Sequence, residues 1–146
     1  MQAIRKRGLP LLAAISKLLA SLLNRMTEEE ILRFVSASVK SIWALELLLM
    51  MRRQKPRAWR TEDLVSELRA STLVVREALA SLGATGFVAN DDAGLFCYRP
   101  AADHLDAFVE STQELYASKP LSIINAIAAA PNEKLRIFAD AFRLKE

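Results

Sequence analysis

Cys97 and His104 are the only cysteine and the only histidine in this chain of 146 residues. A zinc site built from thiolate and imidazole needs more such ligands than these two. A nucleophile activated by histidine would have to be assembled around His104 alone. A single cysteine forms no internal disulfide, which suits a reducing compartment. We therefore expect no enzyme activity, no metal site and no cofactor, and we expect a cytoplasmic protein.

Cations that can bind phosphate gather instead in the segment RRQKPRAWR, Arg52 to Arg60, which holds five Lys or Arg residues. Such a cluster can neutralise several phosphates. The alternative is a solvated helix end, where cations complement the helix dipole. Residues 1–60 hold twelve Lys or Arg against four Asp or Glu, whereas residues 61–146 hold eight against thirteen. We expect these two halves to face different partners.

A helix is predicted over residues 72–82, with Ser71 as its N-cap. Its buried face is expected to consist of apolar residues at helical spacing, namely Val74, Ala78, Leu79 and Leu82. Gly83 and Gly86 should end the helix before a segment rich in β-branched and aromatic residues. On the opposite side, near the N-terminal end, we place Thr72, Val75 and Arg76 as exposed residues.

The run V-R-E-A-L from Val75 to Leu79, opened by a serine and followed by G-F-V, resembles the recognition helix and first wing strand of GntR- and MarR-type bacterial transcription regulators. The resemblance implies a winged helix-turn-helix that inserts this helix into the major groove of DNA. It also implies roles for individual residues: Arg76 bonds a guanine or a phosphate, Ser71 and Thr72 bond phosphate, Val75 touches a thymine methyl, and Arg57 and Arg60 contact phosphates.

The elements before this helix fit the same module. Thr27 and Glu30 form a capping box for a first core helix that should run to about Met51, with Trp43 packed in the core or an interface. Residues 57–60 alternate charged with apolar side chains, which predicts a short strand. Thr61 is the expected N-cap of a short second helix.

The wing is predicted as a hairpin: a strand at residues 87–88, a turn at Asp91 to Gly94, and a return strand from Leu95 to Arg99. Two features depart from the family pattern. Asp91 and Asp92 place negative charge at a tip that commonly carries cations, and Thr72 stands where GntR regulators commonly have arginine. Cys97 is expected to pack as a small strand residue.

Residues 1–25 combine basic residues with an amphipathic apolar run and differ in composition from the rest of the chain. Lys17 interrupts the apolar run, which is too short for a membrane span. Three interpretations remain open: a partner or dimer helix, a membrane-surface helix, or a translated extension upstream of a natural start at Met26.

Residues 101–146 are expected to be helical throughout, with His104 exposed or capping at a helix start. A helix should begin at Asp103 or Asp106, and Pro120 should open another. The face predicted to be apolar in that second helix comprises Leu121, Ile124, Ile127 and Ala128. A final helix is expected from Asn132. These helices are built to pack on the rest of the chain or on a second subunit.

The sequence thus predicts a mainly α protein with a small β-hairpin wing and additional N- and C-terminal helices. Residues 1–26 form an N-terminal extension, 27–100 the winged helix-turn-helix domain, and 101–146 a helical dimerisation or docking region. The predicted function is a DNA-binding transcriptional regulator that acts as a homodimer on double-stranded DNA. The alternative is a winged-helix module that binds another protein, for example at the C-terminal helices, and binds no DNA.

Overall fold

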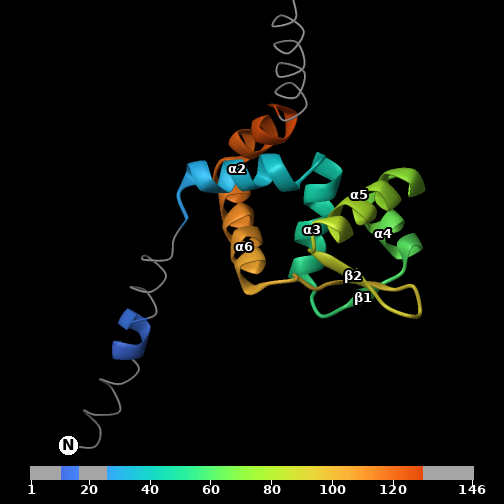
Figure 1. Cartoon of the computed structure of the whole chain (residues 1–146), viewed down its shortest axis with the longest axis horizontal. Helices are drawn as coiled ribbons and strands as arrows, with labels where there is room; N and C mark the ends of the chain where they lie inside the picture. The colour runs from blue at the N-terminus through green and yellow to red at the C-terminus, as the bar shows by residue number, and fades with distance from the viewer. Residues whose placement is uncertain (1–10, 17–25, 130–146) are drawn as a thin grey trace, which may run out of the picture.

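The computed structural model describes residues 11–16 and 26–129, which are mainly α-helical with one small antiparallel sheet (Figure 1). Besides a short helix over residues 11–16, the helices are α2 (Glu28–Ser38), α3 (Ile42–Arg53), α4 (Thr61–Leu68), α5 (Thr72–Ala84), α6 (Asp103–Ser118) and Pro120–Ala129. The strands are β1 (Ala58–Trp59), β2 (Val88–Asn90) and β3 (Phe96–Tyr98). No single helix among the described residues is both long and apolar enough to cross a membrane.

The long helix predicted from residue 27 to residue 51 is in fact two helices, α2 and α3, whose axes differ in direction by 109°. The expected capping box of Thr27 and Glu30 opens α2, and this prediction is confirmed. Val39 adopts an extended conformation after α2, and the Ser41 hydroxyl caps α3 by accepting the Ala44 amide at 3.1 Å. The prediction failed because the helical spacing of apolar residues continues from α2 into α3. The helix is nevertheless interrupted between them, where Val39 is extended and Ser41 begins a new helix.

The sheet has the strand order β1-β3-β2, and both pairs are antiparallel. Cys97 at the centre of β3 pairs with Ala58 on one side and Ala89 on the other. The hairpin between β2 and β3 and the short strand at β1 agree with the sequence-based prediction. Gly94 has a φ of 80° in the hairpin turn, a conformation that glycine adopts without steric cost. Cys97 is a half-buried strand residue, as expected.

Helices α4 and α5 are joined by a short turn in which Arg69 has a left-handed conformation. The N-cap of α4 is Arg60, with no side-chain hydrogen bond, so the prediction of Thr61 in this role was wrong. Ser71 caps α5 as predicted, and its hydroxyl accepts the Val74 amide at 3.2 Å. Helix α5 continues through Gly83, and the left-handed residue that follows is Gly86.

One buried cluster connects α3, α5, the sheet and the C-terminal helices. Its largest fully buried side chains include Trp59, Phe87, Leu48 and Leu82. Burial of such side chains supplies the main favourable free energy of folding. The start of α5 is held on this core by Val75, which is fully buried. The core therefore fixes which flank of α5 faces solvent.

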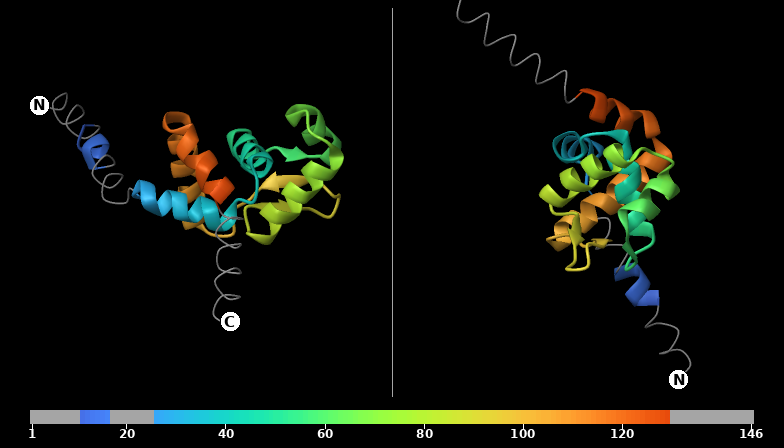
Figure 2. Two further views of the ribbon diagram at one scale, coloured as in Figure 1. Left: turned by 90° about the horizontal axis from the view of Figure 1, so that it is seen from above. Right: turned by 90° about the vertical axis from the view of Figure 1, so that its right-hand side faces the viewer.

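Helix α6 and the helix Pro120–Ala129 lie beside α2, on the side of α3 away from α4 (Figure 2). Phe34 of α2 stacks on Phe108 of α6 with ring centroids 4.3 Å apart and meets Phe87 edge to face at 5.7 Å. Pro120 opens its helix as predicted, but the buried face consists of Ile123 and Ile127.

The apolar face predicted for Pro120–Ala129 was therefore correct only in part, since Ile127 is buried and Ile124 half-buried. Leu121 is 70% exposed and Ala128 is exposed, because the helix is rotated so that Ile123 takes the inward position. The sequence pattern of this helix is compatible with either Leu121 or Ile123 facing inward, and packing against the rest of the protein selects Ile123. The final helix expected from Asn132, like most of residues 1–25, lies outside the described residues.

Candidate nucleic-acid interface

The N-terminal turn of α5 presents Thr72 and Arg76 to solvent, one helical turn apart on one flank. Arg76 forms no ion pair with any other described residue. Ser71, immediately before them, is exposed, although its hydroxyl already accepts an amide as the helix cap. The three residues predicted at this end of the helix therefore lie together at the surface.

Val75, the fourth residue predicted on this surface, is fully buried, so its predicted contact with a thymine methyl group is wrong. The buried positions are Val75, Ala78, Leu79 and Leu82, whereas Val74 is half-buried. Val74 and Val75 are neighbours on the helix, about 100° apart, and both border the apolar face formed by Ala78, Leu79 and Leu82. The buried face therefore includes Val75 in place of Val74, and Leu73 lies on the outer face, where it is 66% exposed.

A shallow groove runs along the other flank of α5, between this helix and the start of α3. Its volume is about 230 Å³, and it is lined by Lys40, Ser41, Trp43, Ala44, Val74, Glu77, Ala78 and Ser81. Trp43 is 43% exposed here, so of the two predicted roles the core position is wrong, and the interface position stays a prediction. Because Leu73 is also exposed on α5, apolar surface flanks the candidate DNA-binding residues. The sequence offered no signal that separates these two residues from core residues.

The five cations predicted as one cluster from Arg52 to Arg60 have separate surroundings. Arg60 forms a two-point ion pair with Asp63, with both N–O distances at 3.3 Å. These hydrogen bonds raise the pKa of Arg60 and lower the pKa of Asp63. Arg60 is exposed, but its charge is matched by an acid on the same helix, so the predicted phosphate contact has a competitor.

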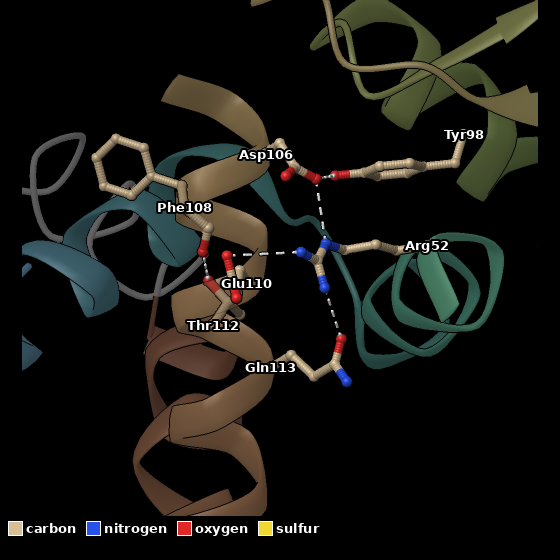
Figure 3. A network of polar contacts seen from close by, with 7 residues as sticks. All are labelled: Arg52, Tyr98, Asp106, Phe108, Glu110, Thr112 and Gln113. Carbon is tan, nitrogen blue, oxygen red and sulfur yellow. Dashed lines mark hydrogen bonds and ion pairs between the residues drawn. The ribbon is translucent and has the colours of Figure 1, made fainter. Parts of the chain in front are cut away.

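Arg52 joins three elements, as Figure 3 shows. Its guanidinium donates to Asp106 of α6 at 3.1 Å and to Gln113 at 3.3 Å, and it lies 3.7 Å from Glu110. Tyr98 of β3 donates its hydroxyl to the same Asp106 oxygen at 2.5 Å. With a side chain only 14% exposed, Arg52 is not available to a phosphate. It connects α3, β3 and α6.

The pKa shifts in this network follow from its geometry. Burial tends to raise the pKa of Asp106, but the hydrogen bonds from Tyr98 and Arg52 and the Arg52 charge outweigh it, so the pKa is lowered. For Arg52 burial acts to lower the pKa, while the hydrogen bond and charge of Asp106 raise it, and the net shift is upward. Burial, then the Asp106 contact, raises the pKa of Tyr98. The network is therefore ionised at Arg52 and Asp106 and neutral at Tyr98 around neutral pH.

Arg57 lies near the opposite edge of the sheet from α5. Its guanidinium carbon is 3.5 Å from the centroid of the Trp59 ring, and it donates to Gln54 at 3.1 Å. Helix α5 packs beside β2, whereas β1 is the far edge strand in the order β1-β3-β2. The side-chain contacts of Arg57 are with Trp59 and Gln54, and neither residue belongs to α5, with which Arg57 was predicted to act.

The tip of the hairpin is acidic, as the sequence indicates, but its two carboxylates differ. One oxygen of Asp91 accepts the amides of Ala93 at 2.9 Å and Leu95 at 2.8 Å, so this side chain shapes the turn. Asp92 makes no hydrogen bond or ion pair with a described residue. The tip therefore presents negative charge where a phosphate contact would need positive charge.

The remaining reactive and concave features of the described residues are a histidine and a second cavity. No group of three or more His, Cys, Asp or Glu side chains in this part of the chain is placed to hold a metal ion. His104 is exposed in the first turn of α6. A second cavity of about 360 Å³ lies between α2 and α6 and is lined by Met26, Glu28, Ile31, Ser111, Glu114, Leu115 and Ser118.

Comparison of the chain with models of known families, with curated proteins and with solved structures finds no match.

Proposed function

We propose that this protein is a winged helix-turn-helix regulator that binds double-stranded DNA as a homodimer through the N-terminal turn of α5. The order α3, β1, α4, α5, β2, β3 supplies the three helices and three strands that such a module requires, and α4 with α5 forms its helix-turn-helix. No enzyme chemistry is part of the proposal.

The observation that carries the proposal is the solvent-facing pair Thr72 and Arg76 above a buried Val75. A helix fixed on its core by one flank, with a hydroxyl and a guanidinium on the other, is suited to the major groove and its phosphates. The exposed Arg69 in the preceding turn adds a further cation near this end of α5. Arg76 is therefore assigned the principal DNA contact, and Thr72 a supporting phosphate contact.

The acidic tip limits how this module can meet DNA. Asp92 would oppose a phosphate backbone, so the proposed complex keeps the hairpin tip away from the strands. Affinity then depends on few cations, and nonspecific binding is weak and strongly dependent on salt. This differs from the arrangement implied by the family resemblance, in which the wing also contacts DNA.

The test is binding of a labelled nonspecific duplex to the full chain at rising salt. Arg76→Ala should weaken binding about tenfold and reduce the slope of log affinity against log salt by about one. Arg33→Ala is the control, because Arg33 is also exposed but pairs with Glu29 on α2. Equal effects of the two substitutions would show that only net charge matters and would contradict the proposal.

A second candidate function, docking of another protein without DNA binding, is favoured by one specific observation. Leu73 and Trp43 are exposed beside the groove between α3 and α5. Apolar side chains of this size at a surface commonly mark protein interfaces. If a correctly folded chain binds no duplex at low salt, this candidate replaces DNA binding.

A further inference from the structure

Three cations precede the edge strand β1 along the chain: Arg53 at the end of α3, Lys55 in the following turn, and Arg57 just before the strand. We call them the β1 basic edge. All three are exposed, and none forms an ion pair with another described residue. By contrast, their neighbours Arg52 and Arg60 both have carboxylate partners. The charge of this edge is therefore available to an external anion.

Two of these side chains are held in place by aromatic rings. The Arg57 guanidinium lies over Trp59, and the Lys55 ammonium is 6.0 Å from the centroid of the Tyr98 ring. A cation–π contact orders a side chain but leaves its charge intact, so less conformational entropy is lost when an anion binds. The Arg57 contact leaves N–H groups of the guanidinium free to donate to an oxyanion.

Two of these cations, Lys55 and Arg57, lie near the same residue of the sheet. Extending the β1–β3 register by one residue puts Arg57 beside Tyr98, whose ring Lys55 also approaches. Side chains alternate between faces along a strand, so Arg99, next to Tyr98, belongs to the opposite face. The charge of Lys55 contributes to lowering the pKa of Asp106, and that carboxylate is already bonded to Arg52 and Tyr98.

We propose that the β1 basic edge is a second phosphate-binding surface, which contacts a nucleic-acid backbone separately from α5. The inference takes its ligand class from the proposed function but does not depend on α5 as the contact. Helix α5 packs beside β2, whereas β1 is the other edge strand of the sheet, so the basic edge is assigned phosphates other than those assigned to Thr72 and Arg76. Arginine recognises phosphate with paired N–H donors, and lysine binds it as a point charge.

The experiment measures the salt dependence of binding of the full chain to a nonspecific duplex. The double variant Lys55→Ala/Arg57→Ala should lower the magnitude of the slope of log affinity against log salt by up to about two, since each lost phosphate contact removes about 0.9. Arg99→Ala serves as the local control, because it removes a cation from a neighbouring position on the opposite face. Arg53→Ala/Lys55→Ala repeats the test without uncovering Trp59, in case loss of Arg57 destabilises the fold.

The outcomes separate this inference from the proposed function. A reduced slope in the double variant, with an unchanged slope in Arg99→Ala, supports the second surface. Equal slopes for the double variant and for Arg99→Ala overturn the inference. If Arg76→Ala is the only substitution that lowers the slope, the inference fails and the proposed function stands. Conversely, if duplex binding changes in the edge variants but not in Arg76→Ala, the second surface is supported and the proposed role of α5 is refuted. Edge-dependent binding of a polyglutamate peptide, with no change in duplex binding, overturns the inference in favour of an acidic protein partner.

Discussion

Arg52 and Arg76 are the same residue type in two contrasting regions of the molecule. At the junction of α3, β3 and α6, Arg52 is largely buried and bonded to Asp106, Glu110 and Gln113. At the start of α5, Arg76 is exposed and has no ion-pair partner among the described residues. A cluster of cations in a sequence therefore predicts local positive charge. Whether one of those cations can bind a ligand depends on which carboxylates the fold places beside it.

The largest predicted effect lies at the junction. Arg52→Ala should lower the free energy of unfolding by about 2 kcal/mol, because it leaves Asp106 partly buried without its cation. Arg76→Ala should change stability by less than about 0.5 kcal/mol, as expected for a surface position. Chemical denaturation of both variants checks this. Equal stability losses would contradict the distinction between the two regions.

The stability contributed by the junction of α3, β3 and α6 should depend on pH. The pKa of Asp106 is lowered in the folded protein, so its contribution to stability is complete above the unfolded value of about 3.9 and is lost as pH falls through the folded value. Asp106→Asn has already lost this contribution, so its stability should depend less steeply on pH below about 4. Denaturation midpoints over an acid series measure the difference, and parallel curves would argue against the ion pair.

Two substitutions at Ser71 distinguish its role as the N-cap of α5 from its proposed contact with DNA. Ser71→Ala should destabilise the protein by about 1 kcal/mol, because the Val74 amide loses its acceptor. Ser71→Asp keeps an acceptor and should remain close to wild-type stability, but its negative charge should weaken duplex binding. Thermal unfolding and duplex binding of the two variants give the readouts. Unimpaired binding by Ser71→Asp would place the DNA elsewhere.

The smallest predicted effect concerns the hairpin tip. Asp92→Lys should leave stability within about 0.5 kcal/mol of wild type, since Asp92 is exposed and makes no hydrogen bond with a described residue. It should strengthen nonspecific duplex binding modestly by removing repulsion. Asp91→Lys is unsuitable for this purpose because Asp91 shapes the turn. No gain in binding would indicate that the tip lies farther from DNA than we propose.

Local sequence signals predicted much of the fold. The capping box at Thr27, the cap at Ser71 and the helix start at Pro120 were correct, because each depends on neighbouring residues alone. The hairpin was also found, since its turn residues lie between two short apolar strands. These features are readable because their determinants are close in sequence.

Tertiary contacts decided the rest. Val74 and Val75 fit the same helical pattern, and packing on the core buried Val75 and left Val74 half-buried. Likewise, nothing local distinguishes Arg52 from Arg53, because the partner Asp106 is 54 positions away. Of the predicted site, Ser71, Thr72 and Arg76 lie together, whereas Arg57 and Arg60 belong to other surroundings.

Mapping of backbone amide chemical shifts during addition of a short duplex locates the surface that contacts DNA. If DNA binds through the start of α5, the largest changes occur in residues 69–76, with a second, weaker set at the β1 basic edge and none around Trp43. Changes confined to the groove between α3 and α5, or no changes at low salt in a folded protein, would contradict it.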